Sequence, residues 1–280
     1  MSIELSRNVI VGQYVPGASL IHRLDPRAKI ICTLIIALTM SSVNRISIGS
    51  ILVLLVIGLT LLARLPLLFV LRGLLPSLPF ILFLFLMQVL FQGSVIPCET
   101  IYYEWWFIQL TPCILYIVAL GVIRVISFLF LISLLTLTTS SSQLTYATES
   151  LLSPLKRIGM PVHEIALANM IGLRFVPTMV EELERIIKAQ ASRGGEIGTE
   201  KWYHPVGMVK SRLPLVVPLF VNSLRRGEDL ILAMEARGYM GGKGRTRFVQ
   251  FRSTQADWIA VGVTVLIYLG SLYLVGFLPV

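Results

Sequence analysis

Long runs of apolar residues alternate with short polar connections along most of the chain. The runs lie at roughly 28–44, 46–63, 74–91, 113–139 and 256–278. A helix needs about 20 apolar residues to cross the hydrocarbon core of a bilayer, although a single run could also be a buried core helix. Because several such runs recur, we predict an all-α polytopic membrane protein with about five transmembrane helices.

The segment 140–255 departs from this pattern because it mixes basic, acidic and apolar residues with prolines. It is too polar to span a membrane and too apolar for a solvated linker. Apolar residues recur at helical spacing in two long stretches, and a shorter helix is expected around 140–159. We therefore predict about three helices at the cytoplasmic face. The chain then divides into 1–139 (N-terminal stretch and transmembrane helices 1–4), 140–255 (cytoplasmic segment) and 256–280 (last transmembrane helix).

Composition supports membrane residence, and the distribution of charge gives an orientation. The 280 residues are 55% hydrophobic and 14% charged, with a mean hydropathy of +0.81, whereas a soluble domain carries about 25% charged residues. Lys and Arg number four in 1–29, two in 64–72, none in 92–112 and sixteen in 140–255. The positive-inside rule makes the first, second and last of these segments cytoplasmic, with Arg45 as a mild exception. A multi-pass protein of the cell membrane follows, with a cytoplasmic N-terminus and an outer C-terminus.

The net charge of +9 would suggest nucleic acid in a soluble protein. Here the basic residues fall between apolar runs, so membrane topology and contact with the lipid bilayer explain them first, and no nucleic-acid partner is expected. The segment 92–112 holds Tyr, Trp and acidic residues, as is typical of a non-cytoplasmic interfacial loop. Cys98 and Cys113 flank this loop. Their pairing is possible but stays open from the spacing alone.

Two groups of charged residues near the apolar runs have simple structural explanations. In "HRLDPRAK" (22–29), Asp25 is suited to cap a helix that begins at Pro26, while Arg27 and Lys29 would anchor it at the interface. Arg124 lies near the middle of the fourth run, where a charge at the bilayer centre costs roughly 2.5 kcal/mol or more. It should face protein, either as an internal hydrogen-bond donor or as a contact to another span or a partner subunit.

No constellation of catalytic or metal-binding residues is apparent. His22, His163 and His204 are scattered, and the cysteines form no CxxC pair. The stretch "GGKGR" (241–245) is not a phosphate loop, because Arg237 replaces the first glycine of that motif and Gly244 replaces its Ser or Thr. We expect no catalytic residue, no metal and no cofactor bound by this chain.

A repeated helix end is the most informative local pattern. The stretch "IIKAQASRGGE" (186–196) recurs 44 residues later as "LILAMEARGYM" (230–240). Each is an apolar helix that ends in Arg followed by Gly, which by itself is an ordinary C-cap. Two such ends on one side of the membrane could dock into two sites of a partner, because Arg offers a planar fork of donors to carboxylates.

These features together resemble a known family. The stretches "GQYVPGASLIHRLDPRAK", "SPLKRIGMP" and "LRFVPTMVEELERIIKAQASRG", with the two helix ends, are similar to the transmembrane T component of energy-coupling factor (ECF) transporters, closest to the type shared by several substrate-binding subunits. The resemblance implies a non-catalytic subunit that couples two cytoplasmic ATPase subunits, which bind the ATP, to a membrane-embedded S subunit that captures a vitamin or metal. It also implies that two triplets contact the ATPases: Ser192, Arg193 and Gly194, and Ala236, Arg237 and Gly238.

An apolar face of the second long cytoplasmic helix is a candidate surface for the S subunit. Its members are Leu213, Val216, Val217, Leu219, Phe220 and Val221. The permease subunit of a conventional ABC transporter remains an alternative, since it also couples through cytoplasmic helices. A stand-alone secondary transporter would need paired repeats with midmembrane binding groups. The transported substrate is not encoded in any motif of this chain.

Overall fold

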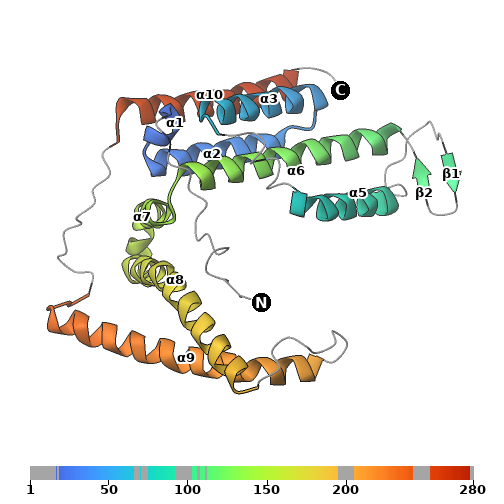
Figure 1. Cartoon of the computed structure of the whole chain (residues 1–280). Helices are drawn as coiled ribbons and strands as arrows, with labels where there is room; N and C mark the ends of the chain where they lie inside the picture. The colour runs from blue at the N-terminus through green and yellow to red at the C-terminus, as the bar shows by residue number, and fades with distance from the viewer. Residues whose placement is uncertain are drawn as a thin grey trace. The chain divides into compact units, whose positions relative to one another are not determined.

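The computed structural model describes residues 17, 19–65, 70, 75–92, 103–105, 108–110, 112–194, 205–241 and 253–277. These residues are mainly helical (Figure 1). The helices are α1 (Leu20–Arg23), α2 (Pro26–Ser42), α3 (Ile46–Leu62), α5 (Leu78–Gln92), α6 (Pro112–Thr138), α7 (Ser141–Leu151), α8 (Val162–Ser192), α9 (Pro205–Ala236) and α10 (Gln255–Phe277), with 3-10 turns η1 (Leu75–Ser77) and η2 (Ser153–Ile158).

The chain forms two compact units. The first, which we call the bundle unit, comprises Gln13–Ala147 together with Gln250–Val280. The second, which we call the two-helix unit, contains Thr148–Val249, and the boundary falls within α7. The three-part division expected from the sequence concerns which segments cross the membrane. Compactness does not test that question, so the division stays a prediction.

The bundle unit is built from apolar helices that pack lengthwise. Helix α2 packs against α10 and α6, while α3 and α5 each pack against α6 (Figure 1). Their shared core consists of aliphatic side chains with almost no exposure, including Met40, Leu52, Val56 and Leu131. The outward sides of the same helices carry large exposed apolar residues, such as Leu54 and Leu266. This inside-and-outside apolarity suits helices that face lipid.

Two of the described helices are long and apolar enough to cross a membrane, namely Pro112–Thr138 and Gln255–Val275. In the apolar window of the second, only 11% is buried inside the protein. Ile46–Leu62 and Leu75–Gln88 are shorter apolar helices. The fourth and fifth predicted runs are thus confirmed as helices of spanning length, while the count of five spans stays a prediction.

A small hairpin interrupts the segment that we interpreted as an aromatic loop. Strands β1 (Tyr103–Trp105) and β2 (Ile108–Leu110) pair antiparallel, with Glu104 opposite Gln109. We did not predict these strands from the sequence. Their aromatic and β-branched residues favour extended structure, which was the available signal. Cys113, which follows this hairpin, is disulfide-bonded and Cys32 is a free thiol, whereas Cys98 lies outside the described residues.

Arg124 donates hydrogen bonds within the chain, as one of the alternatives left by the sequence expects. Its Nε donates to the Met40 carbonyl at 3.2 Å, and its Nη2 donates to the Val43 carbonyl at 2.7 Å and to Asn44 Oδ1 at 2.8 Å. These acceptors lie at the C-terminal end of α2, where carbonyl groups lack helical partners and the helix dipole is negative. The middle of α6 therefore lies beside the turn between α2 and α3.

We expect Arg124→Met to destabilise the bundle unit, because it leaves the half-buried carbonyl groups of Met40 and Val43 without their charged donor. Loss of hydrogen bonds to a charged group is worth about 1.5–3 kcal/mol. Thermal unfolding of the purified chain in detergent would measure the loss. Arg45→Met, in the same turn, is the comparison variant, and equal melting of the two variants would contradict a specific capping role for Arg124.

The N-terminus of α2 is fixed to α10 by a buried polar cluster. Asp25 caps the helix as predicted: its Oδ1 accepts from the Arg27 amide at 2.9 Å, and Pro26 begins the helix. Asp257, at the start of α10, accepts from the Asp25 amide through Oδ1 at 2.8 Å and from the Thr254 amide through Oδ2 at 2.7 Å. The cluster thus joins residues that are far apart in sequence.

The interpretation of Lys29 as an interfacial anchor was wrong. Its side chain is buried, with 6% exposure, and its Nζ donates to the carbonyls of His22 at 3.2 Å and Thr138 at 2.9 Å. It also interacts electrostatically with Asp257 and Asp25. A buried ammonium needs such partners, so Lys29 joins α2 to the end of α6 rather than reaching toward the interface.

The two-helix unit is dominated by α8 and α9, of 31 and 32 residues. A proline inside a helix favours a kink or an interruption, and α9 continues through Pro214 and Pro218 without interruption. Helix α8 likewise continues through Pro177, and Thr178 Oγ1 donates to the Phe175 carbonyl at 2.8 Å beside it. The 3-10 turn η2 ends at Gly159, which has φ +88°.

Candidate functional site

The C-terminus of α8 presents the first predicted triplet. Ser192 is the last helical residue, Arg193 is the C-cap, and Gly194 has φ +78°. The Gly194 amide donates to the Ala191 carbonyl at 3.1 Å, and Ser192 Oγ donates to the Lys188 carbonyl at 3.0 Å. Only glycine adopts this left-handed conformation without steric strain, so the chain turns away immediately after the arginine.

The C-terminus of α9 repeats this geometry. Ala236 is the last helical residue and Gly238 has φ +74°. The Gly238 amide donates to the Glu235 carbonyl at 2.8 Å, and the Tyr239 amide donates to the Met234 carbonyl at 3.0 Å. This pair of bonds defines a Schellman motif. The left-handed glycine caps expected from the sequence are confirmed at both ends.

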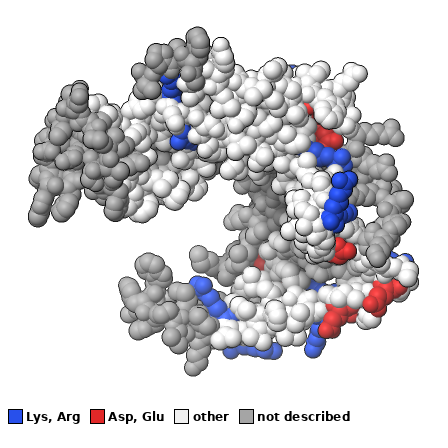
Figure 2. Space-filling model, turned by 180° about the vertical axis from the view of Figure 1, so that it is seen from behind, with Lys and Arg blue, Asp and Glu red and all other residues white. Residues whose placement is uncertain are grey.

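Both triplets are open to solvent in their unit. Every residue of each triplet is exposed, and nothing lies within 4 Å of the position that a Cβ on Gly194 or Gly238 would occupy. Figure 2 shows more charged side chains over the two-helix unit than over the visible surface of the bundle unit, which is mostly uncharged apart from a few groups. Each arginine therefore projects from a helix end that a partner could approach closely.

The six apolar residues proposed for the S subunit fall mainly on an exposed face of α9. Leu213, Val216, Val217, Phe220 and Val221 are exposed, with fractions between 39% and 61%, while Leu219 is half-buried. Leu215, on another side of the helix, is buried at 8%. Helix α9 therefore has a buried side and an apolar side that the described part of its unit leaves uncovered. The assignment of this side to a partner stays a prediction.

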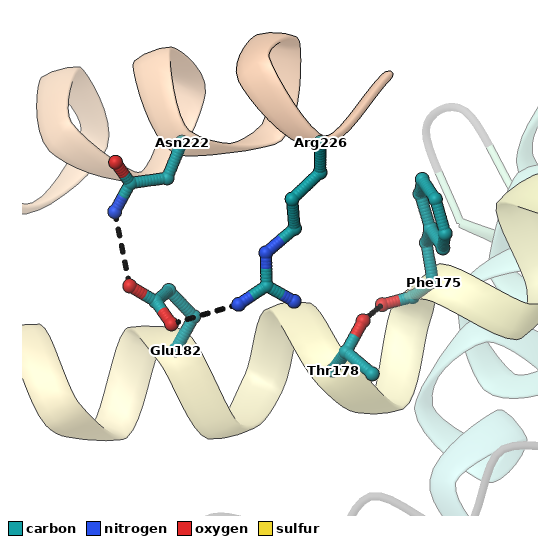
Figure 3. A network of polar contacts seen from close by, with 5 residues as sticks. All are labelled: Phe175, Thr178, Glu182, Asn222 and Arg226. Atoms are coloured by element: carbon teal, nitrogen blue, oxygen red, sulfur yellow. Dashed lines mark hydrogen bonds and ion pairs between the residues drawn. The ribbon is translucent and has the colours of Figure 1, made fainter. Parts of the chain in front are cut away.

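A polar contact that the sequence analysis missed holds α8 and α9 together (Figure 3). Glu182 Oε1 accepts from Asn222 Nδ2 at 2.9 Å, and Glu182 Oε2 accepts from Arg226 Nη2 at 3.1 Å. The Glu182 side chain is 17% exposed and that of Arg226 41%. Sequence spacing alone favours pairs within one helix, such as Glu184 with Lys188 in α8. The available signal was the 44-residue offset, which separates Glu182 from Arg226 just as it separates the two triplets.

Among the residues that the structure describes, no group of three or more His, Cys, Asp or Glu side chains could hold a metal ion. His204 and most of "GGKGR" lie outside those residues. The expectation that this chain binds no metal, nucleotide or other cofactor stays a prediction.

Comparison with known proteins gives consistent matches over most of the chain. The family model described as cobalt transport protein, CbiQ, matches residues 17–248. The energy-coupling factor transporter transmembrane protein EcfT of Ruminiclostridium cellulolyticum is 40% identical over 261 residues, covering 92% of this chain and 94% of the relative. Proteins of the same name from Listeria innocua and Bacillus subtilis are each 40% identical, and the matches cover 90% and 89% of this chain and 93% and 92% of the relatives.

Proposed function

Because the chain belongs to the family of energy-coupling factor transporter transmembrane proteins, we propose that it is the coupling subunit of an ATP-driven importer of vitamins or other micronutrients. In this role it transmits movements of two cytoplasmic ATPase subunits to a membrane-embedded S subunit that holds the substrate. The chain itself forms no catalytic site. ATP is bound and hydrolysed by the partner subunits, and the S subunit determines which substrate is carried.

The observation that supports this proposal best is the repeated helix end. Arg193 and Arg237 follow two long helices, are exposed, and are each followed by a glycine with positive φ. A guanidinium can bind a carboxylate through two parallel hydrogen bonds, and the open space around each glycine admits the wall of a groove. Two equivalent ends match two equivalent ATPase subunits. Closure of the ATPase pair would then move both ends.

The exposed apolar side of α9 offers a second surface through which the movement could reach a partner. Phe220 is 61% exposed and Val216 is 58% exposed, and an uncovered apolar face on a long helix suits a protein partner. We propose that this face contacts the S subunit. Five membrane spans, a cytoplasmic N-terminus and an outer C-terminus complete the proposed arrangement, since they place α8 and α9 on the side where ATP is available.

Purification of the unaltered chain from membranes tests this function. We expect two ABC-type ATPase subunits and at least one small membrane protein to co-purify, and proteoliposomes of the complex to take up substrate only with ATP and the S subunit. Uptake by a complex that lacks any S subunit would instead indicate a conventional ABC permease. Uptake by the chain alone would indicate a secondary transporter, and either result would overturn the proposal.

A further inference from the structure

The contact between Glu182, Asn222 and Arg226 has a position that its local role does not explain. Glu182 lies eleven residues before Arg193, and Arg226 lies eleven residues before Arg237. At 1.5 Å per residue, each arginine is about 16 Å along its helix from the contact. The contact therefore lies at the same distance along each helix from the exposed arginine at that helix's end.

The two helices run in opposite directions where they meet. In Figure 3, the order from Thr178 to Glu182 along α8 runs opposite to the order from Asn222 to Arg226 along α9. The helices are therefore antiparallel where they meet, and their two C-terminal ends extend to opposite sides of the contact. The segment of α8 from the contact to Arg193 and the segment of α9 from the contact to Arg237 are equally long, and the two helices are joined at the contact.

The chemistry of the contact suits a fixed point. Both oxygens of one carboxylate are engaged, and both donors come from the same side of α9, one helical turn apart. This geometry fixes the register along the helix axis, because a shift of α9 in either direction would break one of the two bonds. Charge-assisted bonds to a half-buried carboxylate are also stronger than exposed pairs.

We infer that Glu182, Asn222 and Arg226 form the pivot of a two-armed lever, which makes both arginine-bearing ends move together when the ATPase subunits close. This inference rests on the proposed function and adds three positioning residues to it. The pivot fixes where α8 and α9 cross, so equal displacements at the two ends become a rotation of the helices about one point. Without the pivot, each end would move with its own ATPase subunit, and less of the movement would reach the S subunit.

The chain supplies matched controls for each charged member of the pivot. Glu181 and Arg225 are exposed neighbours of Glu182 and Arg226 with the same side chains. Glu182→Gln and Arg226→Gln remove the pivot charges, whereas Glu181→Gln and Arg225→Gln change net charge equally and leave the contact intact. The exchanged pair, Glu182→Arg with Arg226→Glu, restores an ion pair between the same positions.

The measurement is the amount of substrate taken up per ATP hydrolysed by purified, reconstituted complexes. We expect Glu182→Gln and Arg226→Gln to assemble normally and to hydrolyse ATP, but to take up at least about fivefold less substrate per ATP, as is typical for the loss of a coupling interaction. The exchanged pair should recover most of the ratio. The two controls should match the unaltered complex. A merely structural role would reduce the yield of complex without changing the ratio for the complexes that assemble.

A second readout follows the lever itself. Spin labels at Lys188→Cys and Leu232→Cys, both exposed and again 44 residues apart, report the distance between the two arms in a Cys32→Ala background. We expect a narrow distance distribution that shifts with ATP, and a broad one in Glu182→Gln. Equal uptake ratios and equally narrow distributions in the pivot variants would overturn the pivot while leaving the proposed function standing. Failure of the unaltered chain to bind ATPase subunits would overturn the proposed function itself.

Discussion

Arg193→Glu combined with Arg237→Glu is expected to abolish assembly with the ATPase subunits and, with it, ATP-driven uptake. Each reversal places a carboxylate where the partner is proposed to offer one, so attraction becomes repulsion. Loss of one buried charge pair at an interface costs about 2–5 kcal/mol. Two such losses would leave a complex that does not survive purification. The measurement is the amount of ATPase subunit that co-purifies with the tagged chain, followed by substrate uptake in cells.

The folded chain should tolerate these changes because both arginines are exposed. A double variant at other exposed positions of the same unit, Arg157→Glu with Arg225→Glu, produces the same change in net charge and should assemble normally. Arg193→Lys with Arg237→Lys keeps the charge but loses the planar fork, and should retain part of the binding. Normal assembly of the double Glu variant would show that these helix ends do not hold the ATPases.

The features that the sequence predicted well are helix starts and ends, which depend on a few neighbouring residues. Asp25 followed by Pro26 signals a helix start, and the structure has the expected cap. An arginine followed by glycine signals a helix end, and Gly194 and Gly238 both have the left-handed conformation. Caps depend on side chains and backbone groups within one turn, so their signals are local and readable.

The features that escaped the sequence depend on partners far along the chain. Lys29 looked like an interfacial anchor because its neighbours are basic and the apolar run follows, yet its ammonium reaches the carbonyl of Thr138, 109 residues away. Arg124 was expected to face protein, but its partners at the end of α2 are mainly backbone carbonyls. Every residue has a backbone carbonyl group, so the sequence does not show which of these groups accepts a hydrogen bond from a distant side chain.

The pivot lies between these cases. Asn222 and Arg226 lie 40 and 44 residues after Glu182, and all three are polar residues on predicted helices. Pairing rules within one helix favour neighbours three or four residues away, and these rules directed attention to Glu184 and Lys188. The repeated helix ends carry the signal for this contact, because their offset of 44 residues aligns Glu182 of the first helix with Arg226 of the second.

Asp257→Ala is expected to destabilise the bundle unit by about 3 kcal/mol. Asp257 is 4% exposed, and its carboxylate accepts from two backbone amides, one of which belongs to Asp25, 232 residues away. Removal leaves the buried Asp25 amide without a partner and exposes the half-buried Thr254 amide to water, and hydrogen bonds to a charged group contribute about 1.5–3 kcal/mol each. It also removes one of the two carboxylates that interact with the buried Lys29. The start of α10 would then lose its attachment to the start of α2.

Thermal unfolding of the purified chain in detergent, followed by circular dichroism, measures this effect. For a chain of this size, about 3 kcal/mol corresponds to a fall in melting temperature on the order of 10 °C. The melting temperature of Asp257→Asn should lie between those of Asp257→Ala and the unaltered chain. The amide oxygen of Asn can accept one of the two backbone hydrogen bonds, while its NH₂ group faces the other donor. Gln255→Ala changes an exposed residue in the same turn and should melt with the unaltered chain. If Asp257→Ala also did so, the attachment of α10 would have to come from apolar packing along α2, and the buried cluster would be incidental to it.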